Sequence, residues 1–293
     1  MAKIGLFCLA VLLPAAVISG AMLHSPFPQG YLMGNLGTII AAGGPGGRSP
    51  MVSSAYMNDT VDLGLTATVC TFYDDMDNYQ DRYIAAVTGG GWFARKRMRM
   101  KIAVTLFDAL GTYREQSGFI SCAMALYRSI TVGVDLSGTR SYMPGTDFTP
   151  LTLGTAGVSL FIPLRLVSLS CTVDQLTVRS SRRDGADPQP RIICGIHTSE
   201  HAFGAQGVRI EINPRYEHPV SLALGQEFRI ISRLAIHGAV ANNPLFFGLG
   251  VTVFIGRGHA SAALVNHPVL GWSKGFSAEY GWNPFHGKNR EGN

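Results

Sequence analysis

Five consecutive residues, HTSEH, carry the sharpest metal-binding pattern in the sequence. His197, Glu200 and His201 match the H-x-x-E-H order of inverted zinc proteases, in which two histidines hold the metal and the glutamate polarises a bound water. That chemistry needs a helix, because a helix places both histidines on one face. Thr198 and Ser199 favour turns over helix interiors, and no acidic residue downstream stands out as a third ligand. We therefore expect a polar connection here and reject a metal site.

Three further patterns resemble chemical motifs but lack residues that the chemistry requires. The acidic stretch DDMDNYQD at 74–81 lacks the central glycine and the final glutamate of a calcium loop. The glycine-rich stretch AAGGPGGRSP at 41–50 lacks the GK[ST] ending of a phosphate-binding loop. Serines, histidines and acids are present, but no G-x-S-x-G elbow positions a nucleophile. We expect no catalytic residue and no cofactor, with an enzyme active at an external rim as an alternative.

The remaining charged residues are best understood from the spacing around them. Between residues 97 and 107 the cations Arg97, Arg99 and Lys101 occupy odd positions, and methionine or aliphatic residues occupy the even ones. A period of two places successive side chains on opposite faces of a β-strand, whereas a helix would scatter the charges around its circumference. This segment is therefore predicted to be a strand with one apolar face and one cationic face.

The same alternation recurs from residue 61 to residue 282 and predicts about fourteen antiparallel strands. The polar face consists of small residues with isolated ionisable side chains in mid-strand, and we predict that these line the interior of a barrel. The ionisable set is Arg97, Arg99, Lys101, Asp135, Arg165, Arg209, Glu211, Glu227, Arg229 and His237. Such residues either pair across neighbouring strands and stiffen the wall or form a polar pathway.

Alternation alone also fits a soluble exported β-sandwich, in which the apolar faces turn inward. Two observations favour an all-β transmembrane barrel, in which the apolar faces contact lipid. The predicted connections alternate between very short turns and long polar loops, as in outer-membrane barrels. The long loops are expected near 71–81, 108–117, 139–150 and 175–190. Aromatic residues gather toward strand ends, which is typical of interfacial girdles. These residues are Trp92, Phe93, Tyr127, Phe161, Trp272, Tyr280 and Trp282.

The start of the chain predicts export. Residues 1–21 combine Lys3 with an apolar run and end in small residues, which is the pattern of a cleaved signal peptide. Residues 22–60 form a Gly/Pro-rich segment that either plugs the barrel or lies in the periplasm. The barrel itself is expected over 61–282, and a polar tail over 283–293.

Composition and cysteine content narrow the possible partners. The net charge is +5 and no long basic run is present, which argues against nucleic-acid binding. Four cysteines remain after the leader: Cys70, Cys122, Cys171 and Cys194. The last three share the apolar parity of their strands, where we expect small hydrophobic side chains. An even number of cysteines in an exported protein also permits disulfides.

Three stretches resemble the PorV/PorQ-like branch of the FadL-type outer-membrane barrels. They are FDALGTYREQSGFISCAMALYRSITVGVDLSG, VSLALGQEFRI and HASAALVNHPVLGWSKGFSAEYGW. Within the last, His267 followed by Leu270 and Gly271 is similar to a histidine and LG pattern of that family. The resemblance implies a barrel of 14 strands in the bacterial outer membrane. It also implies transport of hydrophobic molecules or a role as a partner in type IX secretion.

These expectations define a set of partners. They are outer-membrane lipid and lipopolysaccharide, the barrel assembly machinery, and either secretion-system proteins or a hydrophobic small molecule. The basic stretch VRSSRRDGADPQP at 178–190 is the segment best suited to contact lipopolysaccharide phosphates or a protein partner.

Overall fold

The computed structural model describes residues 55, 63–71, 82–93, 98–109, 113–127, 130–146, 149–181, 189–198, 204–214, 219–242, 245–267 and 271–282. The predicted signal peptide, nearly all of 22–60 and the tail 283–293 lie outside these residues. No helix in the described part of the chain is long and apolar enough to cross a membrane.

Fourteen antiparallel strands account for most of the described residues. The first seven are β1 (Leu63–Thr71), β2 (Arg82–Phe93), β3 (Met98–Ala109), β4 (Tyr113–Tyr127), β5 (Ile130–Tyr142), β6 (Leu151–Pro163) and β7 (Val167–Ser180). The last seven are β8 (Arg191–Thr198), β9 (Gln206–Ile212), β10 (Val220–Ile231), β11 (Leu234–Ala241), β12 (Phe246–Ile255), β13 (Gly258–His267) and β14 (Gly271–Trp282). The all-β antiparallel architecture predicted from the alternation is confirmed.

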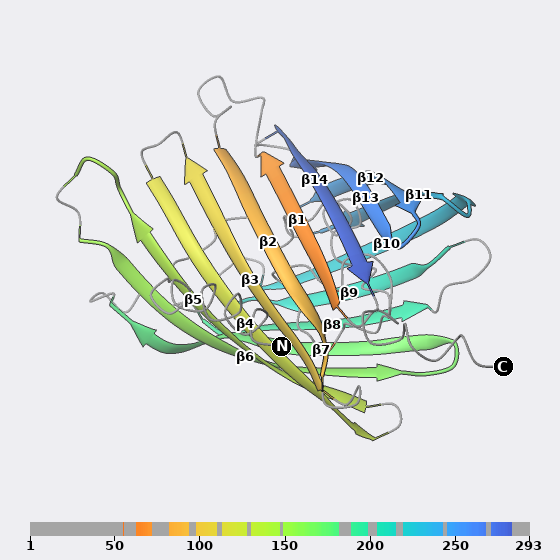
Figure 1. Ribbon diagram of the computed structural model, residues 1–293, viewed down its shortest axis with the longest axis horizontal. Helices are drawn as coiled ribbons and strands as arrows, with labels where there is room; N and C mark the ends of the chain where they lie inside the picture. The colour runs from red at the N-terminus through yellow and green to blue at the C-terminus, as the bar shows by residue number, and fades with distance from the viewer. Residues whose placement is uncertain are drawn as a thin grey trace.

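The sheet closes on itself. Each strand pairs with its neighbour in the chain, and β1 pairs with β14 from Leu63 opposite Trp282 to Thr71 opposite Lys274. The strands tilt, so that β1–β4 on one wall cross β7–β9 on the opposite wall (Figure 1). Because every strand has two partners, the wall has no open edge that could pair with another chain.

The two faces of the wall carry different side chains. Leu136, Leu249 and Phe276 point outward and are 52%, 60% and 54% exposed. Lys101 and His237 point inward and are 1% and 0% exposed. Among the described residues the buried apolar side chains are mostly alanines. This is the opposite of a β-sandwich, in which the large aliphatic residues would form the buried core.

Several details of the predicted wall are wrong. The loops expected near 139–150 and 175–190 begin later than predicted, because β5 continues to Tyr142 and β7 continues to Ser180. The segment 108–117 is not a long loop, because β3 continues to Ala109 and β4 begins at Tyr113. Asp108 and Arg114 lie opposite each other and form an ion pair with 2.5 Å between Oδ2 and Nε, so polar residues extend the strands.

Phe161 does not belong to an outward girdle, because it shares the inward parity of β6 and is 1% exposed.

Two local features shape the wall. Gly256 adopts a positive φ of 59° between β12 and β13, which suits the first central residue of a two-residue hairpin turn. Gln175 adopts a φ of 61°, which is unusual for a residue with a side chain. It lies where the register between β6 and β7 shifts, so β7 carries a bulge at this point.

Candidate functional site

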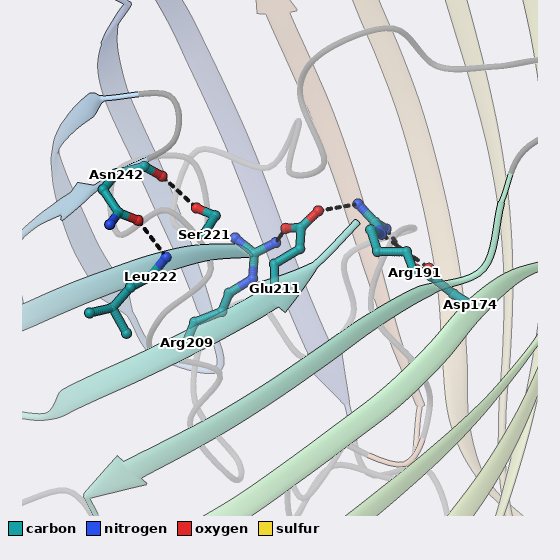
Figure 2. Close-up of polar contacts among 7 residues, drawn as sticks. All are labelled: Asp174, Arg191, Arg209, Glu211, Ser221, Leu222 and Asn242. Carbon is teal, nitrogen blue, oxygen red and sulfur yellow. Dashed lines mark hydrogen bonds and ion pairs between the residues drawn. The ribbon is translucent and has the colours of Figure 1, made fainter. Parts of the chain in front are cut away.

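Four charged side chains form a chain of ion pairs on the inward face of β7, β8 and β9 (Figure 2). Arg191 donates two hydrogen bonds to Asp174, from Nε to Oδ1 at 3.0 Å and from Nη2 to Oδ2 at 2.6 Å. The Nη1 atom of Arg191 also lies 3.5 Å from Oε1 of Glu211. Arg209 pairs with the other carboxylate oxygen of Glu211. We call these four residues the ionic ladder.

The strand register explains why these side chains meet. Asp174 lies directly opposite Arg191, which allows a bidentate pair across the two strands. Glu211 lies opposite Ile193, the next inward residue of β8, so its contact with Arg191 is diagonal. Arg209 and Glu211 are two residues apart on β9 and share a face.

The ionic ladder is balanced in charge and only partly shielded. Two guanidinium groups face two carboxylates, and the side chains are between 9% and 24% exposed. Partly buried charges are tolerated when they are paired and hydrogen-bonded, as they are here. The arrangement presents fixed donors and acceptors of both signs along one side of the interior.

A second polar group lies on the inward face of β3, β4 and β5. Lys101, Ser121 and Asp135 are opposite one another in register on these successive strands. Asp135 interacts electrostatically with Lys101 and accepts a hydrogen bond from Oγ of Ser159 at 3.4 Å. Because a buried ammonium group needs a counter-charge, we assign Asp135 as the counter-ion of Lys101.

One residue that precedes β1, Ala55, contacts this part of the wall. Arg99 is buried beside Lys101 on the inward face of β3 and donates a hydrogen bond from Nη1 to the carbonyl oxygen of Ala55 at 2.8 Å. Ala55 precedes β1 and is itself fully buried. This residue of the predicted segment 22–60 therefore lies inside the barrel. Arg97 lies outside the described residues.

A third polar group joins β11, β12 and β13. His237 is fully buried, and its Nε2 atom lies 3.2 Å from Oγ1 of Thr252, which lies 2.8 Å from Oγ of Ser261. Gly250 is opposite His237. A Cβ atom at Gly250 would lie 2.2 Å from Cε1 of His237, so the imidazole ring occupies the space above this glycine.

Of the other residues predicted to line the interior, Glu227 and Arg229 lie on the inward face of β10 and Arg165 does not line the interior. Glu227 is buried opposite His237 on β10, and the guanidinium carbon of Arg229 lies 5.0 Å from the ring centre of Phe254. Arg165 is not on the wall of the interior, because it lies in the turn 164–166 and is exposed. β6 ends at Pro163, which has no backbone N–H to continue a strand ladder.

The HTSEH pattern does not form a helix at its first residue. His197 lies on the inward face of β8, where its Nε2 atom is 3.0 Å from Oγ of Ser170. Glu200 and His201 lie outside the described residues. In the part of the chain that the structure describes, no three His, Cys, Asp or Glu side chains are grouped as metal ligands would be.

Sequence reasoning missed half of the ionic ladder. Asp174 falls on the same parity as Ser168, Ser170 and Thr172, so the alternation of β7 could have placed it inward. Arg191 was not predicted to face the interior because it directly follows the expected loop 175–190, although it is the first residue of β8. Their pairing depends on strand register, which the alternation of one strand does not specify.

Comparisons with known proteins identify the fold. No protein-family model matches the chain, and neither does any curated protein sequence. A Pseudomonas aeruginosa FadL homologue is similar to this chain with a TM-score of 0.60 and 10% identity, covering 88% of this chain and 99% of that one. The CymD monoaromatic hydrocarbon channel is similar with a TM-score of 0.64 and 11% identity, covering 90% of this chain and 100% of that one. The chain therefore has the fold of a FadL-type barrel.

Proposed function

We propose that this chain spans the bacterial outer membrane as a β-barrel and works in transport across it. The observation that carries the proposal is the sorting of side chains between the two faces of the wall. Exposed aliphatic and aromatic residues cover the outward face of the described strands, and paired charges lie on the inward face. A continuous apolar surface of this kind is unfavourable in water and favourable against the hydrocarbon core of a bilayer.

The inward face supports a polar solute. The ionic ladder and the group around Lys101 present hydrogen-bonding groups of both signs. A hydrocarbon would gain little from such a lining, because apolar pockets are what stabilise apolar ligands. The name of the CymD channel and the resemblance to FadL-type barrels make a hydrophobic molecule the competing cargo.

The position of Ala55 supports a restricted passage. Barrels near eight strands are filled by their own side chains, whereas those of 16 to 18 strands leave a channel. A barrel of 14 strands lies between these cases. The buried contact between Arg99 and Ala55 favours a plug formed by the segment 22–60 over a periplasmic position for that segment.

The partners follow from this location. Residues 1–21 act as the signal peptide, outer-membrane lipid and lipopolysaccharide surround the wall, and the barrel assembly machinery inserts it. The proposed function requires no catalytic residue and no cofactor. A second candidate function, docking of type IX secretion proteins, is supported by the PorV/PorQ-like stretches between 107 and 282.

Conductance measurements test transport directly. The refolded protein is inserted into planar lipid bilayers, and current and reversal potential are compared with those of Arg191→Ala. Removal of this guanidinium leaves the carboxylates of Asp174 and Glu211 in excess, so we expect stepwise currents whose selectivity shifts toward cations. Val134→Ile, on the outward face of β5, is the matched control and should leave selectivity unchanged.

Two outcomes would contradict the proposal. A protein that dissolves in plain buffer without detergent, and that shows no heat-modifiable migration on gels, is not a membrane barrel. A protein that inserts but passes no ions, and that instead co-purifies from solubilised outer membranes with secretion proteins, supports the second candidate function.

A further inference from the structure

Two cysteines from neighbouring strands meet on the outward face of the wall. Cys171 on β7 and Cys194 on β8 are direct partners in the antiparallel register. Their Sγ atoms lie 2.7 Å apart, and both thiols are free in this structure. Aliphatic residues occupy most outward positions of the wall. An apolar outer surface therefore does not by itself explain why two cysteines lie opposite each other.

The strand register places the two cysteines within reach of a disulfide. Directly opposed residues of an antiparallel pair have Cα atoms about 4.5 or 5.5 Å apart, and disulfides span Cα separations of about 4.4 to 6.8 Å. Both side chains leave the sheet on the same face. We propose that Cys171 and Cys194 form an intrachain disulfide that links β7 to β8.

The reaction is a thiol–disulfide exchange. The two thiols lose two protons and two electrons and form one S–S bond. A protein or small-molecule disulfide accepts both and is reduced to two thiols. This step rests on the proposed export, because such oxidants are maintained outside the cytoplasm.

The position of the link suggests what it controls. Pairing between β7 and β8 ends at Asp174 opposite Arg191, three positions from the two cysteines. The bulge at Gln175 follows directly. A link between Cys171 and Cys194 would therefore hold the two strands together three residues from the ion pair of Asp174 with Arg191. The link and the ion pair would lie on opposite faces of the sheet.

The chain supplies its own controls. Cys122 also lies on the outward parity, but its register partners are Met100 and Val134. Cys70 is buried on the inward face of β1. Neither has a cysteine opposite it, so neither is expected to form an intrachain link.

The test is thiol counting on the full chain folded in detergent. The protein is incubated with oxidised glutathione, blocked with a maleimide under denaturing conditions, and digested without reduction for mass spectrometry. We expect a peptide containing Cys171 joined to one containing Cys194, and the loss of both thiols from the maleimide count. Cys194→Ser should abolish the joined peptide, whereas Cys122→Ser should leave it at the wild-type level.

The possible results separate the two proposals. If the barrel folds with heat-modifiable migration but all its thiols still react, or if the link involves Cys70 or Cys122, the disulfide is excluded while the membrane barrel stands. If the protein folds without detergent and the joined peptide still forms, the disulfide is supported and the membrane barrel fails.

Discussion

Gly250 provides a test at the scale of one residue. Gly250→Ala places a methyl group where the ring of fully buried His237 lies, with 2.2 Å between Cβ and Cε1. We expect a loss of about 1–3 kcal/mol in the free energy of unfolding, because the ring must move within a packed interior. Urea unfolding of the detergent-folded protein measures this loss. Gly154→Ala, whose nearest atoms are 3.8 Å away, should cost clearly less, and equal midpoints would show that His237 moves freely.

The period of two predicted the face on which a side chain lies but not its partner. It put Arg99, Lys101 and His237 on the inward face of their strands, and all three side chains are buried. It could not show that Arg191 bridges Asp174 and Glu211, because that contact depends on the register between three strands.

At the scale of the strands, the alternation predicted the elements well and their ends poorly. The sequence around 108–117 contains Asp108, Arg114 and Glu115, which are charged residues typical of a loop. The structure uses them as strand residues, since Asp108 and Arg114 pair across β3 and β4. Cross-strand ion pairs can stabilise two paired strands beyond the segment in which apolar residues alternate.

The turn between β12 and β13 allows a test of how strongly one glycine constrains a hairpin. Gly256→Ala puts a side chain on a residue whose φ is 59°, and we expect it to cost about 1–2 kcal/mol. A lower urea midpoint would report this strain. Arg257→Ala in the same turn is the control, because φ is positive at Gly256 and not at Arg257. If both variants unfold at the wild-type midpoint, the turn does not constrain the hairpin.

For the whole molecule, the outward surface is the decisive feature. Leu249 is 60% exposed on the outward face of β12. We expect Leu249→Arg to destabilise the lipid-inserted barrel by up to about 2–4 kcal/mol, the cost of a cation at the bilayer midplane. Folding into lipid vesicles, followed by heat-modifiable migration, measures this effect.

Leu249→Ile is the matched control for this position and should insert like the wild type. A barrel surrounded by water would predict the reverse order, with the arginine variant folding at least as well as the wild type.

Lys274 is a cation that the outward face already carries. It lies opposite Thr71, the last residue of β1, where a long side chain can reach the polar boundary.

The pairing of β1 with β14 dictates when the molecule can be completed. Thr66 and Glu279 are hydrogen-bonded although 213 positions separate them in the chain. During translation β1 emerges first and has no final neighbour until the last strand has been made. Until then its unpaired backbone and apolar side chains would favour aggregation. The unfinished chain therefore needs a chaperone throughout its passage to the membrane, and truncation before β14 would leave a sheet that cannot close.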